Sequence, residues 1–137
     1  MLGEAEAGRR LASVLALLAR RDVRYVSVKL SAIFSQIHAP AFDESLAAAR
    51  RKLRLLYRAA LPDGKFVNLD MEEYRDLHLT CDAFREVLDE PEFMQLEAGI
   101  VLQAYLPDSW PVQKDLIAWA KQRVARGGAG IKIRIVK

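Results

Sequence analysis

The sequence has little that could form a disulfide or a metal centre. Its 137 residues include one cysteine and two histidines. The cysteine, Cys81, cannot form an internal disulfide, and no further cysteine or group of histidines supplies the spacing of a metal site. We therefore expect a protein of a reducing compartment that holds no metal ion.

Long apolar runs and a strong charge of one sign are also lacking. No uncharged run approaches the roughly 20 residues that span a bilayer, and Glu4 and Glu6 stand where a signal peptide would carry basic residues. The formal net charge is only +3. The basic residues are scattered over predicted helices that also carry acids, which disfavours nucleic-acid binding through this segment. We expect a soluble, cytoplasmic protein.

The densest basic run, residues 50–58, has two interpretations. It carries the side chains of Arg50, Arg51, Lys52, Arg54 and Arg58. A run of this kind at helical spacing usually forms a solvated helix face, and a polyanion-binding patch is the less favoured alternative.

Apolar spacing predicts four helices that alternate with four strands. Apolar residues recur three and four positions apart over residues 4–20, 42–60 and 80–88, and over a segment that opens at Asp108 or Ser109. This is the spacing of one helix face. Short apolar and β-branched runs predict strands between these helices. The predicted strands are residues 24–30, 65–70, 99–104 and 131–136.

Several side chains in the predicted helices carry more detailed expectations. Asp43 and Thr80 are candidate N-caps, because short polar side chains accept hydrogen bonds from the first helical N–H groups. We expect the last helix to end at Arg126 and the glycines that follow it. Its expected buried residues are Leu116, Trp119, Ala120 and Val124.

The alternation of helices and strands predicts an α/β fold with a parallel sheet. A doubly wound sheet would be expected to carry a glycine-rich phosphate turn after an early strand, and no strand here has one. A (β/α) barrel is therefore favoured. A closed barrel has eight strands and typically about 250 residues. We interpret residues 1–137 as a partial (β/α)8 barrel, truncated at both ends.

Each predicted strand carries one polar side chain at or near its C-terminal end. These side chains are Lys29, Asp70, Gln103 and Arg134. The C-terminal ends of barrel strands converge on one face, where barrel enzymes build their active sites. The four residues are therefore candidates for one site.

The motifs around these residues resemble the proline dehydrogenase family. The resemblance is closest to the proline dehydrogenase domain of bifunctional proline utilization A flavoproteins. It runs through residues 1–5 (MLGEA), 26–32 (VSVKLSA), 68–73 (NLDMEE), 101–105 (VLQAY) and 133–137 (IRIVK). The motifs follow the family's order and cover nearly the whole chain, from the end of the first barrel strand through the fifth.

This resemblance implies an enzyme that oxidises L-proline to Δ1-pyrroline-5-carboxylate with FAD. Electrons would pass to a quinone at the membrane, so the complete enzyme is expected in the cytoplasm and peripheral to the inner membrane. Later strands, and a helix with paired arginines that bind the substrate carboxylate, are expected outside this segment. We therefore expect the 137-residue chain alone to be inactive.

The resemblance also implies a role for each candidate residue. Lys29 corresponds to the lysine at the substrate carboxylate, and Asp70 to an active-site carboxylate that orders the pocket. The cofactor-binding residues are Gln103 and Arg134, at the flavin ring, and Val136 and Lys137, which begin a further cofactor-contacting turn.

Two other functions remain open from the residues alone. Lys29 at a barrel strand end could form a Schiff base, as in a class I aldolase. Alternatively, the chain is a non-catalytic half-barrel that self-associates through open sheet edges, because unpaired strand edges invite pairing with another copy.

The remaining chemically versatile side chains are expected to be structural. Glu72 and Glu73 are more typical of a solvated helix turn than of an acid/base pair, and His38 and His78 stand alone in the sequence. Tyr105 directly follows the candidate strand end and is a candidate for lining the site. We expect Trp110, Trp119 and Cys81 to pack in the core.

Overall fold

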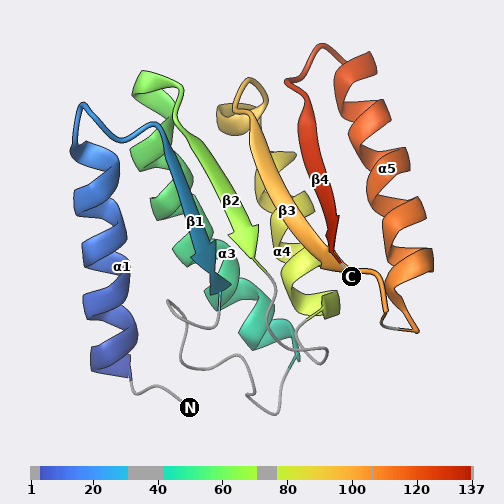
Figure 1. Cartoon of the computed structure of the whole chain (residues 1–137), viewed down its shortest axis with the longest axis horizontal. Helices are drawn as coiled ribbons and strands as arrows, with labels where there is room; N and C mark the ends of the chain where they lie inside the picture. Colours follow the sequence, from blue (N-terminus) through green and yellow to red (C-terminus); the bar gives the residue numbers. More distant parts are fainter. Residues whose placement is uncertain (1–3, 31–41, 71–76, 106, 137) are drawn as a thin grey trace.

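A computed structural model of the chain describes residues 4–30, 42–70, 77–105 and 107–136 (Figure 1). Helices and strands alternate along these residues, as the sequence predicts. In chain order they are α1 (Glu4–Ala19), β1 (Tyr25–Lys29), α3 (Phe42–Ala60), β2 (Phe66–Asp70), α4 (Leu77–Leu88), β3 (Ala98–Gln103), α5 (Ser109–Ala125) and β4 (Ile131–Val136). Two 3-10 turns, Leu61–Asp63 and Pro91–Phe93, precede β2 and β3.

The four strands form one parallel sheet in the order β1-β2-β3-β4. Figure 1 shows α3 and α4 behind the sheet, with α1 beside β1 and α5 beside β4. A sheet whose neighbours in space are neighbours in sequence, each joined by a helix, is the architecture of a (β/α) barrel. None of the helices in the described residues has the length and apolar character needed to cross a membrane.

The strands bury one face against the helices, and no helix of the described residues packs on the other face. Val26 and Val28 of β1 point into a core shared with the helices α1, α3, α4 and α5, and so do core residues on the same face of the other strands. Those residues are Val67, Leu69, Ala98, Ile100, Leu102, Ile131 and Ile133. Side chains alternate along a strand. The residues between these therefore lie on the opposite face, called the open face below.

The basic run of α3 is largely neutralised by carboxylates on and after α4. Three arginines one helical turn apart pair with three glutamates. The pairs are Arg50–Glu86 (3.0 Å), Arg54–Glu90 (2.8 Å) and Arg58–Glu92 (2.8 Å). These ion pairs across the helix pair favour the solvated helix face over the polyanion-binding patch.

Both predicted N-caps are wrong by position. α3 begins at Phe42, which makes Asp43 its second residue, and α4 begins at Leu77, which makes Thr80 a buried residue inside the helix. The burial of Leu77 and Leu79 in the core extends α4 by nearly one turn. Tertiary packing therefore outweighs the local capping preference here.

The burial predicted for α5 is also partly wrong. Leu116 and Trp119 are buried and Ala120 is partly buried, but Val124 is 53% exposed and Arg123 takes the core position beside it. Trp110 is 63% exposed, which contradicts its predicted packing role. Trp119 packs edge-to-face on Phe84 and, like Cys81, belongs to the core as expected.

Arg123 is fully buried and holds together the segments that lead into β3 and β4. Its guanidinium donates to the carbonyl oxygens of residues in both segments. The acceptors are Leu88, Phe93 (2.7 Å), Met94 (3.0 Å), Leu96 (2.9 Å) and Ala129 (3.0 Å). A buried cation is tolerable only when its donors are satisfied, and these carbonyls satisfy it without a carboxylate.

A second buried cation, Lys65, acts in the same way at the start of β2. Its ammonium donates to the carbonyl oxygens of Leu18 and Arg20, at and just after the end of α1. A positive charge there also suits the negative end of the helix dipole. Lys65 and Arg123 therefore both lie at the N-terminal ends of the strands, away from the candidate site.

Candidate functional site

The candidate site residues share the open face. Lys29, Asp70, Gln103 and Arg134 each follow a strand residue that points into the core, so alternation places them on the open face. Val136 lies two residues after Arg134 and therefore on the same face. The strand-end pattern in the sequence therefore selects residues of one face. Lys137, Glu72, Glu73 and His38 lie outside the described residues.

Three of these residues form one row across the sheet. Lys29 and Asp70 are register partners at the ends of β1 and β2. Continuing the β2–β3 register one residue past its last pair puts Asp70 level with Val101, which is the register partner of Arg134. From β1 to β4, the row therefore contains an ammonium, a carboxylate, an isopropyl group and a guanidinium, carried by Lys29, Asp70, Val101 and Arg134. Arg134 belongs to this row although it lies two residues before the end of β4.

Gln103 and Val136 form the next row, nearer the C-terminal ends of the strands. They are register partners, and the amide of Ala104 donates to the carbonyl oxygen of Val136 at 2.7 Å, which extends the β3–β4 pairing past Gln103. Tyr105 follows in an exposed turn beside this row. The Gln103 amide thus lies on the same face as the Arg134 guanidinium, one row further along.

A groove of about 440 Å³ opens beside the Lys29–Asp70 pair. It is lined by Ser27, Val28, Lys29 and Asp70 and, from α1, by Arg10, Ser13 and Val14. The charged row therefore borders a hollow at the β1 edge of the sheet.

The open face carries an excess of positive charge. In the described strands its cations are Lys29, Lys132 and Arg134, against the single carboxylate of Asp70. Lys132 was not among the predicted site residues, because it lies near the start of its strand, but alternation from Arg134 places it on the same face. A face with this balance favours anionic ligands.

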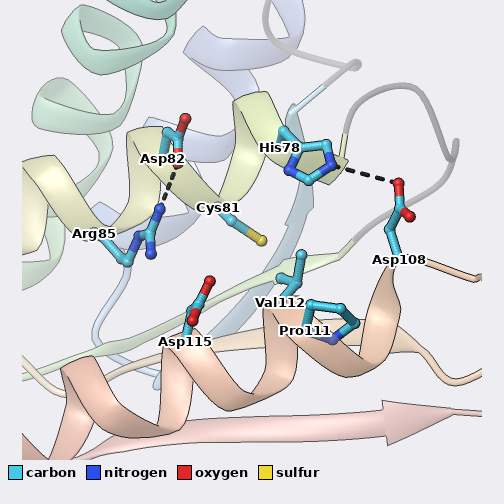
Figure 2. A pocket seen from close by; sticks show the side chains of 8 residues that line it. All are labelled: His78, Cys81, Asp82, Arg85, Asp108, Pro111, Val112 and Asp115. Carbon is cyan, nitrogen blue, oxygen red and sulfur yellow. Dashed lines mark hydrogen bonds and ion pairs between the residues drawn. The ribbon is translucent and has the colours of Figure 1, made fainter.

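A second hollow, of about 250 Å³, lies between α4 and α5 on the helical side of the sheet (Figure 2). His78 approaches Asp108 at 3.6 Å across it, and Arg85 pairs with Asp82 at 2.5 Å. Burial raises the pKa of the Cys81 thiol to about 12, so the thiol is not a nucleophile near neutral pH. Within the described residues, no cluster of three or more His, Cys, Asp or Glu side chains could hold a metal ion.

Comparison with known proteins extends over the whole chain. A family model described as proline dehydrogenase matches residues 1–137. No curated protein matches. Among solved structures, proline utilization A (PutA) from Corynebacterium freiburgense is 49% identical with a TM-score of 0.94, over 99% of this chain and 14% of that one.

Two further structures extend the comparison. PutA from Bdellovibrio bacteriovorus, inactivated by N-propargylglycine, is 34% identical with a TM-score of 0.86, over 99% of this chain and 16% of that one. PutA from Bradyrhizobium japonicum is 22% identical with a TM-score of 0.83, over 98% of this chain and 14% of that one, and shows the fold alone. The described strands and helices therefore form part of a (β/α)8 barrel, as predicted, and the chain spans about one seventh of the length of these proteins.

Proposed function

The chain belongs to the proline dehydrogenase family, and from this premise we propose that it supplies the substrate- and flavin-facing strands of an enzyme that oxidises L-proline to Δ1-pyrroline-5-carboxylate. One observation carries the proposal. Lys29, Asp70 and Arg134 lie in one row on the open face, with Gln103 in the row beside it.

Lys29 is proposed to bind the carboxylate of proline. A lysine ammonium is a compact point charge that suits a carboxylate, and Lys29 borders the groove at the β1 edge. Asp70, its register partner, would hold the ammonium in place and keep the positive charge of the row from being unpaired in a partly closed site.

Gln103, Arg134 and Val136, followed by Lys137, are proposed to hold FAD. The donor set fits a flavin, because the amide of Gln103 and the guanidinium of Arg134 share a face and the charge excess there would stabilise negative charge on the reduced ring. Bound FAD would supply the hydride acceptor for the carbon next to the ring nitrogen of proline. The residues of this chain would orient that carbon and hold the carboxylate.

The electron acceptor and location follow the family resemblance. We propose a membrane quinone as acceptor and a cytoplasmic position peripheral to the inner membrane. The class I aldolase alternative, with Lys29 as the Schiff-base residue, has less support, because the proline dehydrogenase family model matches the chain over its whole length.

The proposal is tested by proline-dependent dye reduction in the complete flavoenzyme that carries this segment. We expect saturation by proline, inhibition by carboxylate analogues of proline, and a raised KM for proline in Lys29→Met. Lys114→Met, on the outer side of α5, is the matched control and should retain activity. Borohydride trapping of a keto substrate on Lys29, without proline oxidation, would favour the aldolase instead. The 137-residue chain alone should show no turnover.

A further inference from the structure

Asn68 occupies the centre of the open face, one row below the candidate site. It is the register partner of Ser27 on β1 and of Gly99 on β3. It precedes Asp70 by two residues, so the two side chains point the same way about 6.6 Å apart along the strand. Asn68 is only 4% exposed, although the helices of the described residues pack on the other face of the sheet.

The amide of Asn68 is held from both neighbouring strands. Its Nδ2 donates to the hydroxyl oxygen of Ser27 at 3.2 Å, which links β1 to β2 through side chains. On the other side, a Cβ on Gly99 would lie 2.8 Å from Asn68 Oδ1. Carbon and oxygen atoms do not approach so closely without a bond. The missing side chain of Gly99 therefore provides the space that the Asn68 amide fills.

An aromatic pair closes this row from below. The ring of Phe66 also lies over Gly99, with Cζ 2.7 Å from the position a Cβ would take. Phe66 stacks on Tyr25 with ring centroids 5.4 Å apart and planes 7° from parallel. Ser27, Gly99 and Phe66 thus surround the Asn68 side chain on three sides. Along its own strand, the next side chain on the same face toward the C-terminal end is Asp70.

From this geometry we propose that Asn68 is a positioning residue for the Lys29–Asp70 pair, and that Gly99 is the residue that makes room for it. The hydrogen bond to Ser27 ties β1 to β2 directly beneath Lys29 and Asp70, and so fixes the spacing of the two charged groups. Because the Asn68 amide is neutral, it links the two strands without changing the net charge around Lys29 and Asp70. The inference rests on the proposed function, since the spacing matters only if the pair binds substrate.

The test uses steady-state kinetics of the complete flavoenzyme and of variants at Asn68 and Ser27. Asn68→Leu keeps the shape but removes the donor, Ser27→Ala removes the acceptor, and the double variant removes both. Gln113→Leu is the matched control, because Gln113 makes an amide-to-hydroxyl bond of the same 3.2 Å length to Ser109 on the outer helix α5. FAD content and thermal midpoint are measured for each protein.

Each single variant at the open face should raise KM for proline about three- to tenfold, with a smaller change in kcat, FAD content retained and Gln113→Leu unchanged. The double variant should be no worse than the more affected single variant, because both lose one interaction. Asn68→Asp should raise KM further than Asn68→Leu, since a second carboxylate competes for Lys29.

Unchanged KM in Ser27→Ala and Asn68→Leu, in an unmodified enzyme that oxidises proline, would overturn the inference and leave the proposed function standing. Independent, multiplying effects of the two variants would also overturn it. If Asn68→Leu does not fold, Ser27→Ala decides alone, because it removes the same bond from an exposed position. Absence of proline oxidation in the unmodified enzyme would instead contradict the proposed function.

Discussion

Lys29 and Arg134 stand in one row but are assigned to different partners, and this assignment can be checked residue by residue. Asp70 separates Lys29 from Val101 and Arg134. With two strands between them, the two cations lie far enough apart to act on different ligands. Substitutions that remove one charge at a time should therefore produce different defects.

In the complete flavoenzyme, Lys29→Met should weaken the binding of proline and of carboxylate inhibitors by roughly one to two decades while FAD stays bound. Arg134→Met should change the flavin absorption spectrum, the reduction potential or the FAD content even without substrate, because it removes a donor facing the flavin. Inhibitor titration and flavin spectroscopy separate the two. Loss of FAD in Lys29→Met, together with altered proline binding alone in Arg134→Met, would show both roles to be wrong.

Cys81 should behave as an inert core thiol. Its pKa is raised from 9.0 to about 12 by burial, so the neutral thiol is favoured in the folded state. The corresponding contribution to the unfolding free energy is complete below pH 9 and is lost as pH rises toward 12. At pH 8 the folded chain should react with a disulfide reagent about 100-fold more slowly than the chain unfolded in urea. Ala12→Cys in a Cys81→Ala background, an exposed thiol on α1, should react rapidly as the control.

The open-face residues were predictable because side chains alternate between the two faces of a strand. Once Val28 or Ile133 is assigned to the core, the face of every other residue in its strand follows. The burial of Arg123 was not predictable in the same way. Its acceptors Leu88 and Leu96 lie 35 and 27 residues away in the sequence. A local sequence pattern does not show which distant carbonyl groups the fold brings to one side chain. Helical spacing therefore favoured Val124, which the structure exposes.

At the scale of elements, one side chain joins α5 to the connection between α4 and β3. Arg123 donates to carbonyls at the end of α4, in the 3-10 turn Pro91–Phe93 and just before both β3 and β4. Gly128 allows this, since a Cβ there would lie 2.8 Å from Arg123 Cγ. The position of the β3–β4 pair relative to its helices thus depends on one guanidinium.

Replacing Arg123 by Met should lower the free energy of unfolding by on the order of 3 kcal/mol or more, because it leaves several buried carbonyls without donors. Urea unfolding followed by circular dichroism measures this. Arg126→Met, three residues further on, is the control: its ion pair with Asp89 is exposed, at 3.3 Å, and its loss should cost at most about 1 kcal/mol. Equal losses for the two variants would mean that the buried network contributes little.

Element boundaries were less predictable than element types. All four strands and all four helices of the described residues occur where apolar spacing places them, but α4 begins three residues before the expected Thr80 cap. A cap is a local preference of about 1 kcal/mol. Burying Leu77 and Leu79 in the core gives a larger gain. The sequence cannot rank the two without the position of the neighbouring strands.

Over the whole molecule, the described sheet has two strands, β1 and β4, with one neighbour each. Beside β4 lies an apolar groove of about 510 Å³ lined by residues of α5 and β4, including Ile117, Val124, Ile131 and Ile133. Within a longer barrel this surface would be covered by the next helix and strand. On the 137-residue chain it would face water.

The purified 137-residue chain should therefore associate with itself through these edges, as unpaired strands and apolar grooves promote. Light scattering after size-exclusion chromatography should show a mass that grows with concentration. Val124→Lys, in the groove, should reduce the association, whereas Leu55→Lys, an equally exposed apolar position on α3, should not. A monomer at all concentrations would contradict this.

Lys65 and Arg123 lie at the N-terminal ends of the strands, and the candidate site residues at or toward the C-terminal ends. A protein engineer could therefore randomise the site end extensively without touching the groups that hold the strands to their helices. A library diversified at positions such as 29, 103 and 105 should contain a larger share of folded members than one of equal size diversified at 65, 123 and 128. New substrate preferences are accordingly more accessible to this scaffold than new stability.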